Sequence, residues 1–332
     1  MPWAMYGFLA FATGLAMYFL GVFLVVPRYL LGLDAWLRPV AEWLVWYSGL
    51  PLVFGTAMVL FDMLVLLGGK RSGAEVRSDP VQQAGITVAL TAYNDEASIG
   101  PAVRDFLTHP RVGSVIVVSN NSRDATLARA QEAGALVFNE EQPGYGRCVH
   151  RCFTESLRLP GSELPGSDLP GSGLIVLCEG DGTFIAADID KLIAYAPHAE
   201  IVNGTRTVER LRQPITQLST FMYYGNFFVG KLLESKHLGA ATITDVGTTY
   251  KLCRREALER LMPALNPGIN LEFNAHFLDT ALAEGFTLVE CPITFHPRVG
   301  ISKGGNVNNR RALQVGLRMI LGIVFGWRKR PA

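Results

Sequence analysis

Residues 4–26 contain no charged side chain, and this run limits the possible folds more than any other feature of the chain. A helix of about 20 apolar residues is long enough to cross the hydrocarbon core of a bilayer. The run is not typical of a cleaved signal peptide, because Met1, Pro2 and Trp3 supply no basic side chain before it and no clear cleavage site follows it. We therefore predict that these residues form a first transmembrane helix.

A second apolar run, residues 48–68, is interrupted only by a proline and Asp62. Trp and Tyr side chains gather around the polar connection between the two runs, as is typical of a membrane–water interface. Lys70 and Arg71 follow the second run and favour a cytosolic position for its end. An acid in an apolar span is costly, and Asp62 can reach the lipid headgroups or pair with Lys70, so we favour a structural role for it. Residues 1–69 are thus predicted to contain two transmembrane helices.

The composition of the whole chain excludes some classes of function. Apolar residues make up 49% of the 332 residues and charged residues 18%, and the apolar excess is concentrated in the N-terminal runs. The net charge of +1 gives no sign of a basic surface for nucleic acid, so we expect no nucleic-acid partner. The five cysteines form no Cys-x-x-Cys pair, and an odd count fits a reducing compartment.

Strand-like and helix-like segments alternate between residues 85 and 304. The strand-like segments are short apolar runs bounded by turn residues, and helical segments separate them. This alternation predicts an α/β, Rossmann-like domain with a mostly parallel sheet and helices on both faces, preceded by a polar linker at 70–84. Strands are predicted at 86–90, 114–118, 135–138, 174–178, 199–203 and 287–291, helices at 95–107, 125–133, 217–239 and 272–284, and a loop leading into a helix at 144–157.

Two segments differ from this alternation. Residues 159–173 consist of three copies of a five-residue unit that begins Leu-Pro-Gly-Ser, and such a composition cannot pack a core, so we predict a flexible surface loop. Residues 305–332 place Arg311 and Arg318 on one face of a helix, continue as an apolar run and end in basic residues. This pattern predicts an amphipathic helix associated with a membrane surface.

The predicted strand at 174–178 ends abruptly at Glu179, Gly180 and Asp181. The two acids would lie just past the carboxyl end of a buried parallel strand, where ligands bind in open α/β sheets. Carboxylate oxygens are the ligands that hard divalent cations prefer, and such a cation can hold a phosphate. The pair therefore predicts a site for a metal ion and a phosphorylated ligand.

Polar loops also follow other predicted strands, at 91–96, 119–124 and 144–146, and would meet the two acids at one edge of the sheet. In order and spacing, these loops resemble the family 2 glycosyltransferases with the GT-A fold, and specifically the branch that includes dolichyl-phosphate mannose synthase. The resemblance covers residues 85–304. It implies a GT-A domain that transfers a sugar from a nucleotide to a polyprenyl phosphate.

The first two loops imply contacts with the nucleotide-sugar donor. The family has a Pro-Thr-Tyr-Asn-Glu motif that holds the nucleotide base and ribose. Tyr93, Asn94 and Asp95 match it, and Thr91 stands where the proline usually is. Tyr93 and Asp95 are therefore implied as donor contacts. The family's next loop begins with two acids, and Asn120 stands in the second of these positions. An amide both donates and accepts hydrogen bonds, so we expect Asn120 to pair with the edge of the base.

The family's acid-x-acid motif implies the cofactor, which is Mg²⁺ or Mn²⁺. At the matching positions we expect Asp181 to bind the metal directly, and Glu179 to bind it through water or to contact the donor. Later motifs imply further site residues. The family's Gly-Ser-Arg motif is matched at Arg206, and its Asp-x-x-Ser-Gly-Phe-Arg motif is matched from Asp245 onward. Its Arg-x-x-Gly-x-Ser-Lys motif is matched by Arg298, Ser302 and Lys303.

The resemblance implies a hexosyl transfer with inversion at the anomeric carbon. The metal on Asp181, together with Arg298 and Lys303, would stabilise the departing diphosphate. A lipid phosphate is already ionised and needs no general base as the acceptor. A hydroxyl acceptor would need one, for which Asp245 is the first candidate and Glu272 the second.

Two alternatives stay open from the sequence. One is transfer to a hydroxyl of a lipid or a cell-envelope glycan, and the other is a non-catalytic scaffold that binds a sugar nucleotide. In the favoured interpretation, the protein is a multi-pass membrane enzyme of a bacterial inner membrane with a cytoplasmic catalytic domain. Its partners would be the nucleotide-sugar donor, the polyprenyl phosphate acceptor and the lipid bilayer, and a homo-oligomer is compatible with the sequence.

Overall fold

A computed structural model describes residues 1–71, 75–81, 85–159, 173–300 and 308–328. The chain divides into two compact units. The first unit comprises residues 1–74 with 232–240, and the second comprises residues 75–231 with 241–332. The first unit consists of helices, and the second contains the β-sheet.

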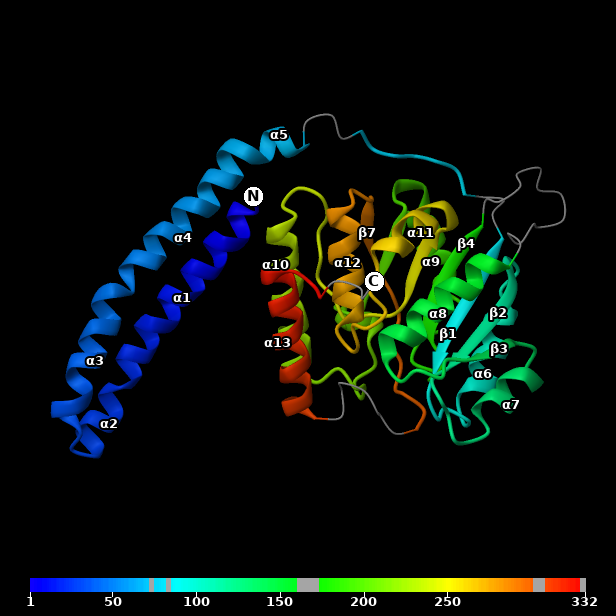
Figure 1. Cartoon of the computed structure of the whole chain (residues 1–332), viewed down its shortest axis with the longest axis horizontal. Coiled ribbons are helices and arrows are strands. Elements are labelled where there is room, and N and C mark those ends of the chain that lie inside the picture. The colour runs from blue at the N-terminus through cyan, green and yellow to red at the C-terminus, as the bar shows by residue number, and fades with distance from the viewer. Residues whose placement is uncertain (72–74, 82–84, 160–172, 301–307, 329–332) are drawn as a thin grey trace. The chain divides into compact units, whose positions relative to one another are not determined.

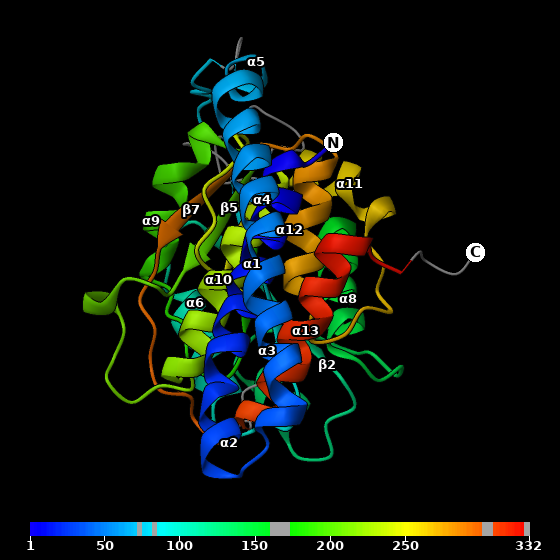
Figure 2. The same ribbon diagram turned by 90° about the vertical axis from the view of Figure 1, so that its left-hand side faces the viewer.

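The first unit is built on a helical hairpin (Figure 1). One arm consists of α1 (Trp3–Phe23) and α2 (Val25–Leu30), and the other consists of α3 (Asp34–Tyr47), α4 (Gly49–Phe61), a π-helical turn (Asp62–Leu66) and α5 (Leu67–Arg71). Figure 2 shows α1 alongside α3 and α4. The continuous helical stretches Trp3–Leu30 and Asp34–Arg71 are long and apolar enough to cross a membrane, as the sequence predicted.

Glycines allow the two arms of the hairpin to pack closely. Gly7, Gly14 and Gly21 recur at every seventh position of α1 and face α3 and α4. A Cβ atom at Gly7 would lie 2.7 Å from the carbonyl oxygen of Gly55, and one at Gly55 would lie 2.5 Å from that of Gly7. Small residues of this kind let membrane helices approach each other closely.

Asp62 is fully buried and joins the two arms of the hairpin. Its Oδ2 accepts a hydrogen bond from the backbone N–H of Ala4 at 2.9 Å, and its Oδ1 lies 2.5 Å from Lys70 Nζ. The contact with Ala4 satisfies one of the N–H groups that the first turn of a helix leaves unpaired. Of the two contacts that the sequence allowed, the structure therefore shows the ion pair with Lys70.

The second unit contains one sheet of seven described strands in the order β3-β2-β1-β4-β6-β5-β7. Neighbouring strands are parallel, except that β6 runs antiparallel to both β4 and β5. The strands are β1 (Ile86–Ala92), β2 (Val112–Ser119), β3 (Leu136–Asn139), β4 (Leu174–Glu179), β5 (Ile201–Thr205), β6 (Lys251–Arg254) and β7 (Leu288–Pro292).

Helices cover both faces of this sheet (Figure 1). On one face, α6, α7 and α9 pack against alternate residues of the central strands and form the main hydrophobic core. On the other, α8 contacts β1, β2 and β4, and its Phe153 stacks on Phe277 of α12. The helices are α6 (Ile99–Leu107), α7 (Thr126–Glu132), α8 (Tyr145–Arg158), α9 (Asp188–Tyr195), α10 (Thr220–Lys236), α11 (Arg255–Leu261), α12 (Phe273–Ala283) and α13 (Asn309–Phe325), with short 3-10 turns at Ala196–His198, Glu209–Leu211 and Met262–Ala264.

The structure confirms the predicted α/β class with a mostly parallel sheet. Each of the six strands expected from the sequence is present, with ends shifted by one or two residues in most cases. Strand β6 was not expected. It has only four residues and begins at the charged Lys251, so it lacks the apolar run that marked the other strands. The repeat predicted as a surface loop falls almost entirely at 160–172, outside the described residues.

The C-terminal helix α13 packs against α12. Beyond its end, Trp327 Nε1 donates a hydrogen bond to Asp279 Oδ2 at 2.7 Å, and Asn266 Nδ2 donates to the carbonyl oxygen of Arg328 at 2.7 Å. A Cβ atom at Gly322 would lie 2.4 Å from the Trp327 ring, so glycine is required at that contact. These contacts fix α13 on the second unit. Its predicted association with a membrane surface stays a prediction.

Candidate active site

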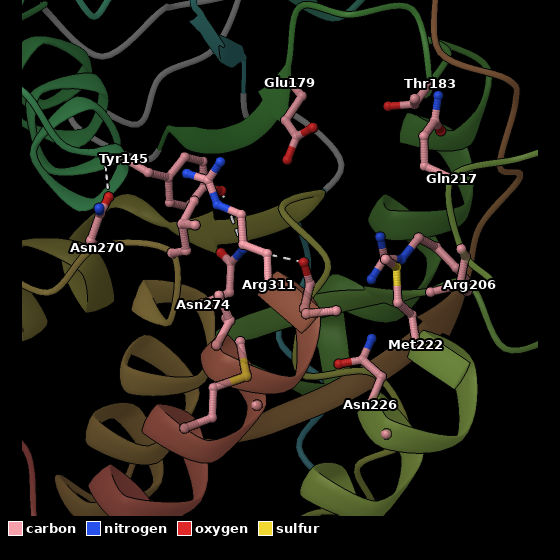
Figure 3. A pocket seen from close by; sticks show the side chains of 18 of the residues that line it. Tyr145, Glu179, Thr183, Arg206, Gln217, Met222, Asn226, Asn270, Asn274 and Arg311 are labelled. Carbon is pink, nitrogen blue, oxygen red and sulfur yellow. Dashed lines mark hydrogen bonds between the residues drawn. The ribbon is translucent and has the colours of Figure 1, made fainter. Parts of the chain in front are cut away.

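The loops that follow β1, β2, β4 and β5 leave the sheet at one edge, because these four strands run in the same direction. They form the polar end of a cavity of about 590 Å³ (Figure 3). Eight residues that the sequence analysis selected line this cavity, namely Thr91, Tyr93, Asp95, Asn120, Glu179, Asp181, Arg206 and Arg298. The structure therefore brings together residues that are more than 200 positions apart in the chain.

Arg298 connects two carboxylates at the polar end. Its Nη1 lies 3.0 Å from Asp181 Oδ2, and its Nη2 donates a hydrogen bond to Asp95 Oδ1 at 2.7 Å. Its Nε–H group is buried and donates to no described residue. The backbone and side chain of Thr183 donate to Asp181 Oδ1 at 3.0 and 2.5 Å, and the backbone N–H of Tyr93 donates to Asp95 Oδ2 at 2.9 Å. These bonds fix the orientation of both carboxylates.

Glu179 is a third carboxylate at this end of the cavity. Burial and, secondly, the charge of Asp181 raise its pKa to about 7. The Thr249 hydroxyl donates a hydrogen bond to Glu179 Oε1 at 2.6 Å, and the Tyr145 hydroxyl lies 2.7 Å from Thr249 Oγ1. Asn274 Nδ2 in turn donates to the Tyr145 hydroxyl at 3.2 Å. A chain of hydrogen-bonded hydroxyl and amide groups therefore holds the Glu179 carboxylate in place.

Lys251 lies at the far end of this chain and is fully buried. Its Nζ donates to Asn274 Oδ1 at 3.3 Å and to the carbonyl oxygen of Thr248. Burial lowers the pKa of Lys251 to about 7. Lys251 stands at the last position of the Asp-x-x-Ser-Gly-Phe-Arg match, so a buried lysine occupies the position of the family's arginine.

Arg206 and Asp245 form a second buried ion pair. Arg206 Nε and Nη2 donate to the two carboxylate oxygens of Asp245 at 2.7 and 2.8 Å. Asn226 Nδ2 and the backbone N–H groups of Arg206 and Gly247 also donate to this carboxylate, at 2.6, 3.0 and 3.1 Å. Burial alone would raise the pKa of Asp245, but the charge and hydrogen bonds of Arg206 lower it below its ordinary value.

This geometry corrects the expected role of Asp245 as a proton acceptor. A carboxylate with a lowered pKa that already accepts five hydrogen bonds is a poor general base. Asp245 does not line the cavity, whereas Arg206 does. The second candidate base, Glu272, precedes the first residue of α12 and does not line the cavity either. We infer that Asp245 positions Arg206.

The expected role of Asn120 also changes. Its Nδ2 donates to the carbonyl oxygens of Glu140 and Gln142 at 3.1 and 2.9 Å, and its Oδ1 accepts from the backbone N–H of Gly144 at 2.9 Å. Both amide hydrogens are therefore already used, and the side chain has none to donate to a base. Asn120 instead fixes the loop at 140–144, which leads into α8 at the rim of the cavity. Two further predicted residues, Ser302 and Lys303, lie outside the described residues.

The other end of the cavity is apolar and was not expected from the sequence. It lies between α10 and α13, whose aromatic and aliphatic side chains line it. The apolar lining residues are Phe221, Met222, Phe228 and Val229 of α10 and Leu313, Val315, Leu317, Met319 and Ile320 of α13. Aromatic side chains recur along α10. Its proximity to α13 depends on the tertiary fold, so no local pattern indicates this chamber.

The donor groups at the polar end fit a divalent cation. The carboxylates of Glu179 and Asp181 line the same cavity, and their mutual repulsion contributes to the raised pKa of Glu179. A bound cation would remove this repulsion, and oxygen ligands suit Mg²⁺ and Mn²⁺. No group of three or more His, Cys, Asp or Glu side chains is arranged to hold a metal ion within the part of the chain that the structure describes.

Comparisons with known proteins agree with this architecture. No protein-family model matches the chain. The chain is 29% identical over 218 residues to an uncharacterized glycosyltransferase of Mycobacterium tuberculosis, an alignment that covers 65% of this chain and 87% of the relative. It is 27% identical over 243 residues to a polyprenol monophosphomannose synthase of Mycolicibacterium smegmatis, covering 68% and 83% of the two chains.

A solved structure shares the fold. The glucosyl-3-phosphoglycerate synthase of Mycobacterium tuberculosis, crystallised with Mn²⁺, uridine diphosphate and phosphoglyceric acid, superposes with a TM-score of 0.51 at 16% identity, over 77% of this chain and 81% of that protein. At this identity the likeness concerns the fold alone. The resemblance to family 2 glycosyltransferases is thus confirmed: the chain is a homologue of glycosyltransferases, among them a polyprenol monophosphomannose synthase, and it has the GT-A fold.

Proposed function

We propose that the protein is a membrane-bound, metal-dependent, inverting glycosyltransferase that moves a sugar from a UDP- or GDP-sugar to a polyprenyl phosphate at the cytosolic membrane face. The observation that carries this proposal is the two-part cavity. Its carboxylate-lined end suits a nucleotide diphosphate with a metal ion, and its apolar end suits a hydrocarbon chain. The two apolar helical stretches support attachment to a membrane, where such an acceptor is found.

No carboxylate of the described residues near the cavity is well placed to act as a general base, and this favours a phosphate over a hydroxyl as the nucleophile. A hydroxyl must lose a proton as it attacks, so it needs a nearby base. Asp245 is paired with Arg206, and Glu272 does not line the cavity. Glu179 has a suitable pKa of about 7, but it would be committed to the metal ion. A phosphate monoester is ionised at neutral pH and attacks without this help.

Asp181 and Glu179 would hold the metal ion, which when bound neutralises charge on the departing diphosphate. Arg298 would contribute positive charge to the same group, since Asp181 and Asp95 direct its guanidinium along the cavity wall. Thr249 and Tyr145 would keep the Glu179 carboxylate oriented. Tyr93 and Thr91 would contact the nucleoside, and Ser302 and Lys303 stay proposed as phosphate contacts from the family match alone.

A transfer assay tests this proposal. Purified protein in detergent with Mn²⁺ is offered radiolabelled UDP- and GDP-sugars together with undecaprenyl or dolichyl phosphate. We expect label to enter a lipid product that mild acid cleaves, because a sugar linked through its anomeric carbon to phosphate is acid-labile. Label found only in an alkali-stable glycolipid would contradict the proposal and favour a hydroxyl acceptor. Binding of donor without turnover would favour a sugar-nucleotide-binding scaffold.

A further inference from the structure

Three cationic side chains line the described part of the cavity, and they differ in their partners. Arg298 pairs with Asp181 and Asp95 at the polar end, and Arg206 pairs with Asp245. The third is Arg311, near the N-terminal end of α13. Its backbone N–H donates to Asn308 Oδ1 at 2.8 Å, which caps the helix, but its guanidinium forms no ion pair with a described carboxylate.

Arg311 projects into the cavity from α13, and Arg206 approaches from another side (Figure 3). The sequence pattern placed Arg311 and Arg318 on one face of the helix. The structure separates the two residues, because Arg311 lines the cavity and Arg318 does not. A positive charge is therefore placed where the polar end of the cavity meets its apolar end.

Two glycines at the apolar end of the cavity have empty space beside them. A Cβ atom at Gly225 of α10 or at Gly316 of α13 would meet no atom within 4 Å, so packing requires glycine at neither position. Gly322 of the same helix differs, since a Cβ there would meet the Trp327 ring at 2.4 Å. Gly225 and Gly316 both line the cavity and leave space between the apolar side chains of the two helices.

We propose that Arg311 binds the phosphate of the lipid acceptor and that the lipid chain lies between α10 and α13, past Gly225 and Gly316. This assignment rests on the proposed function, since it specifies how that acceptor is held. The charge of Arg206 is offset by Asp245, so Arg311 supplies the further positive charge that a phosphate monoester requires. The Arg311 guanidinium can donate two hydrogen bonds to phosphate oxygens, which a lysine cannot do in the same geometry.

The test measures binding separately from turnover. Radiolabelled undecaprenyl phosphate is titrated against wild-type protein in detergent micelles, with undecaprenol, which lacks the phosphate, as the competing ligand. We expect Arg311→Gln to weaken binding of undecaprenyl phosphate about tenfold or more and to leave binding of undecaprenol unchanged. The matched control is Arg318→Gln, which removes the same charge from α13 outside the cavity and should bind as the wild type does.

A second pair of variants tests the path of the chain. Gly316→Leu should weaken binding of both undecaprenyl phosphate and undecaprenol, because the new side chain fills the space between the helices. Gln314→Leu adds the same side chain to α13 at a position that does not line the cavity, and it should have no effect. Thermal unfolding of each variant, followed by circular dichroism, checks that α13 stays folded.

The outcomes test the binding role of Arg311 and the proposed transfer reaction separately. If Arg311→Gln or Gly316→Leu binds undecaprenyl phosphate as the wild type does, the assignment is wrong, whatever the turnover. If the wild type binds this lipid through Arg311 but transfers no sugar to it, the assignment stands and the proposed reaction is wrong. If the wild type prefers undecaprenyl phosphate no more than undecaprenol, Arg311 does not recognise a phosphate and the assignment is wrong.

Discussion

Arg206 and Arg298 line the same cavity, and each pairs with a buried aspartate, but the two pairs are built differently. Arg206 contacts a single acid through two parallel hydrogen bonds, and three further donors complete the shell of Asp245. Arg298 is shared between Asp95 and Asp181, its Nε–H donates to no described residue, and Glu179 adds a third negative charge nearby.

The difference indicates what each pair does. A buried pair whose hydrogen bonds are complete fixes local structure, and removal of one partner leaves a buried charge without compensation. A cluster of three acids around one arginine carries excess negative charge. Such a cluster suits a site that binds a metal cation together with the phosphates of a donor. We therefore interpret Arg206–Asp245 as a pair that holds the cavity wall, and Arg298 with its acids as the part that acts on the donor.

Asp245→Asn should have the largest effect on stability. It leaves the Arg206 guanidinium buried with no negative partner, which costs about 3–5 kcal/mol of unfolding free energy. Chemical denaturation followed by circular dichroism measures this change. If the two pairs were equivalent, Asp181→Asn would destabilise the protein as strongly, and the distinction between them would be lost.

Asp181→Asn should instead remove turnover and leave the fold intact. The substitution deletes a metal-binding oxygen and its charge, so we expect sugar transfer to fall about 100-fold or more. Arg298 keeps Asp95 as its partner, and for this reason the unfolding temperature should change little. Transfer at the wild-type rate by this variant would refute the assignment of Asp181 to the metal ion.

Lys251, whose Nζ donates a hydrogen bond to Asn274, should make the unfolding free energy depend on pH. Its pKa is about 7 in the folded protein and about 10.5 when unfolded, so the unfolded chain binds more protons between these values. Stability should therefore rise with pH across this window, by about 1.4 kcal/mol per pH unit at most. Unfolding curves of the wild type and Lys251→Met between about pH 7 and pH 9, which lie inside this window, measure this contribution. An equal slope in the two proteins would show that Lys251 is not buried as an amine.

Thr249→Val should have the smallest effect. It removes one hydrogen bond to Glu179 and retains the shape of the side chain, so the Mn²⁺ concentration for half-maximal activity should rise about fivefold. Thr249→Ser keeps the hydroxyl and serves as the control. If the valine variant requires no more Mn²⁺ than the serine variant, the hydroxyl chain behind Glu179 does not support a metal ligand.

The sequence predicted the elements whose signals are local. Six strands have apolar runs, and Asp181 and Glu179 end one of them, so both the sheet and the edge at which its polar loops meet were predictable. Strand β6 was missed because its four residues include the buried Lys251. The roles expected for Asn120 and Asp245 changed because their hydrogen-bond partners, such as Gly144 and Arg206, come from distant segments. The chamber between α10 and α13 likewise depends on tertiary packing.

The linkage in the product tests the central claim most directly, namely that a phosphate in this cavity attacks the sugar. The enzyme is incubated with a donor carrying carbon-13 at the anomeric position and with undecaprenyl phosphate, and the lipid product is studied by phosphorus NMR. Our account predicts a single phosphodiester phosphorus coupled to the labelled carbon. If the phosphorus of undecaprenyl phosphate remained an uncoupled monoester while the labelled carbon entered a co-purified lipid that bears a hydroxyl, the result would contradict our account, because the sugar would then have been transferred to a hydroxyl.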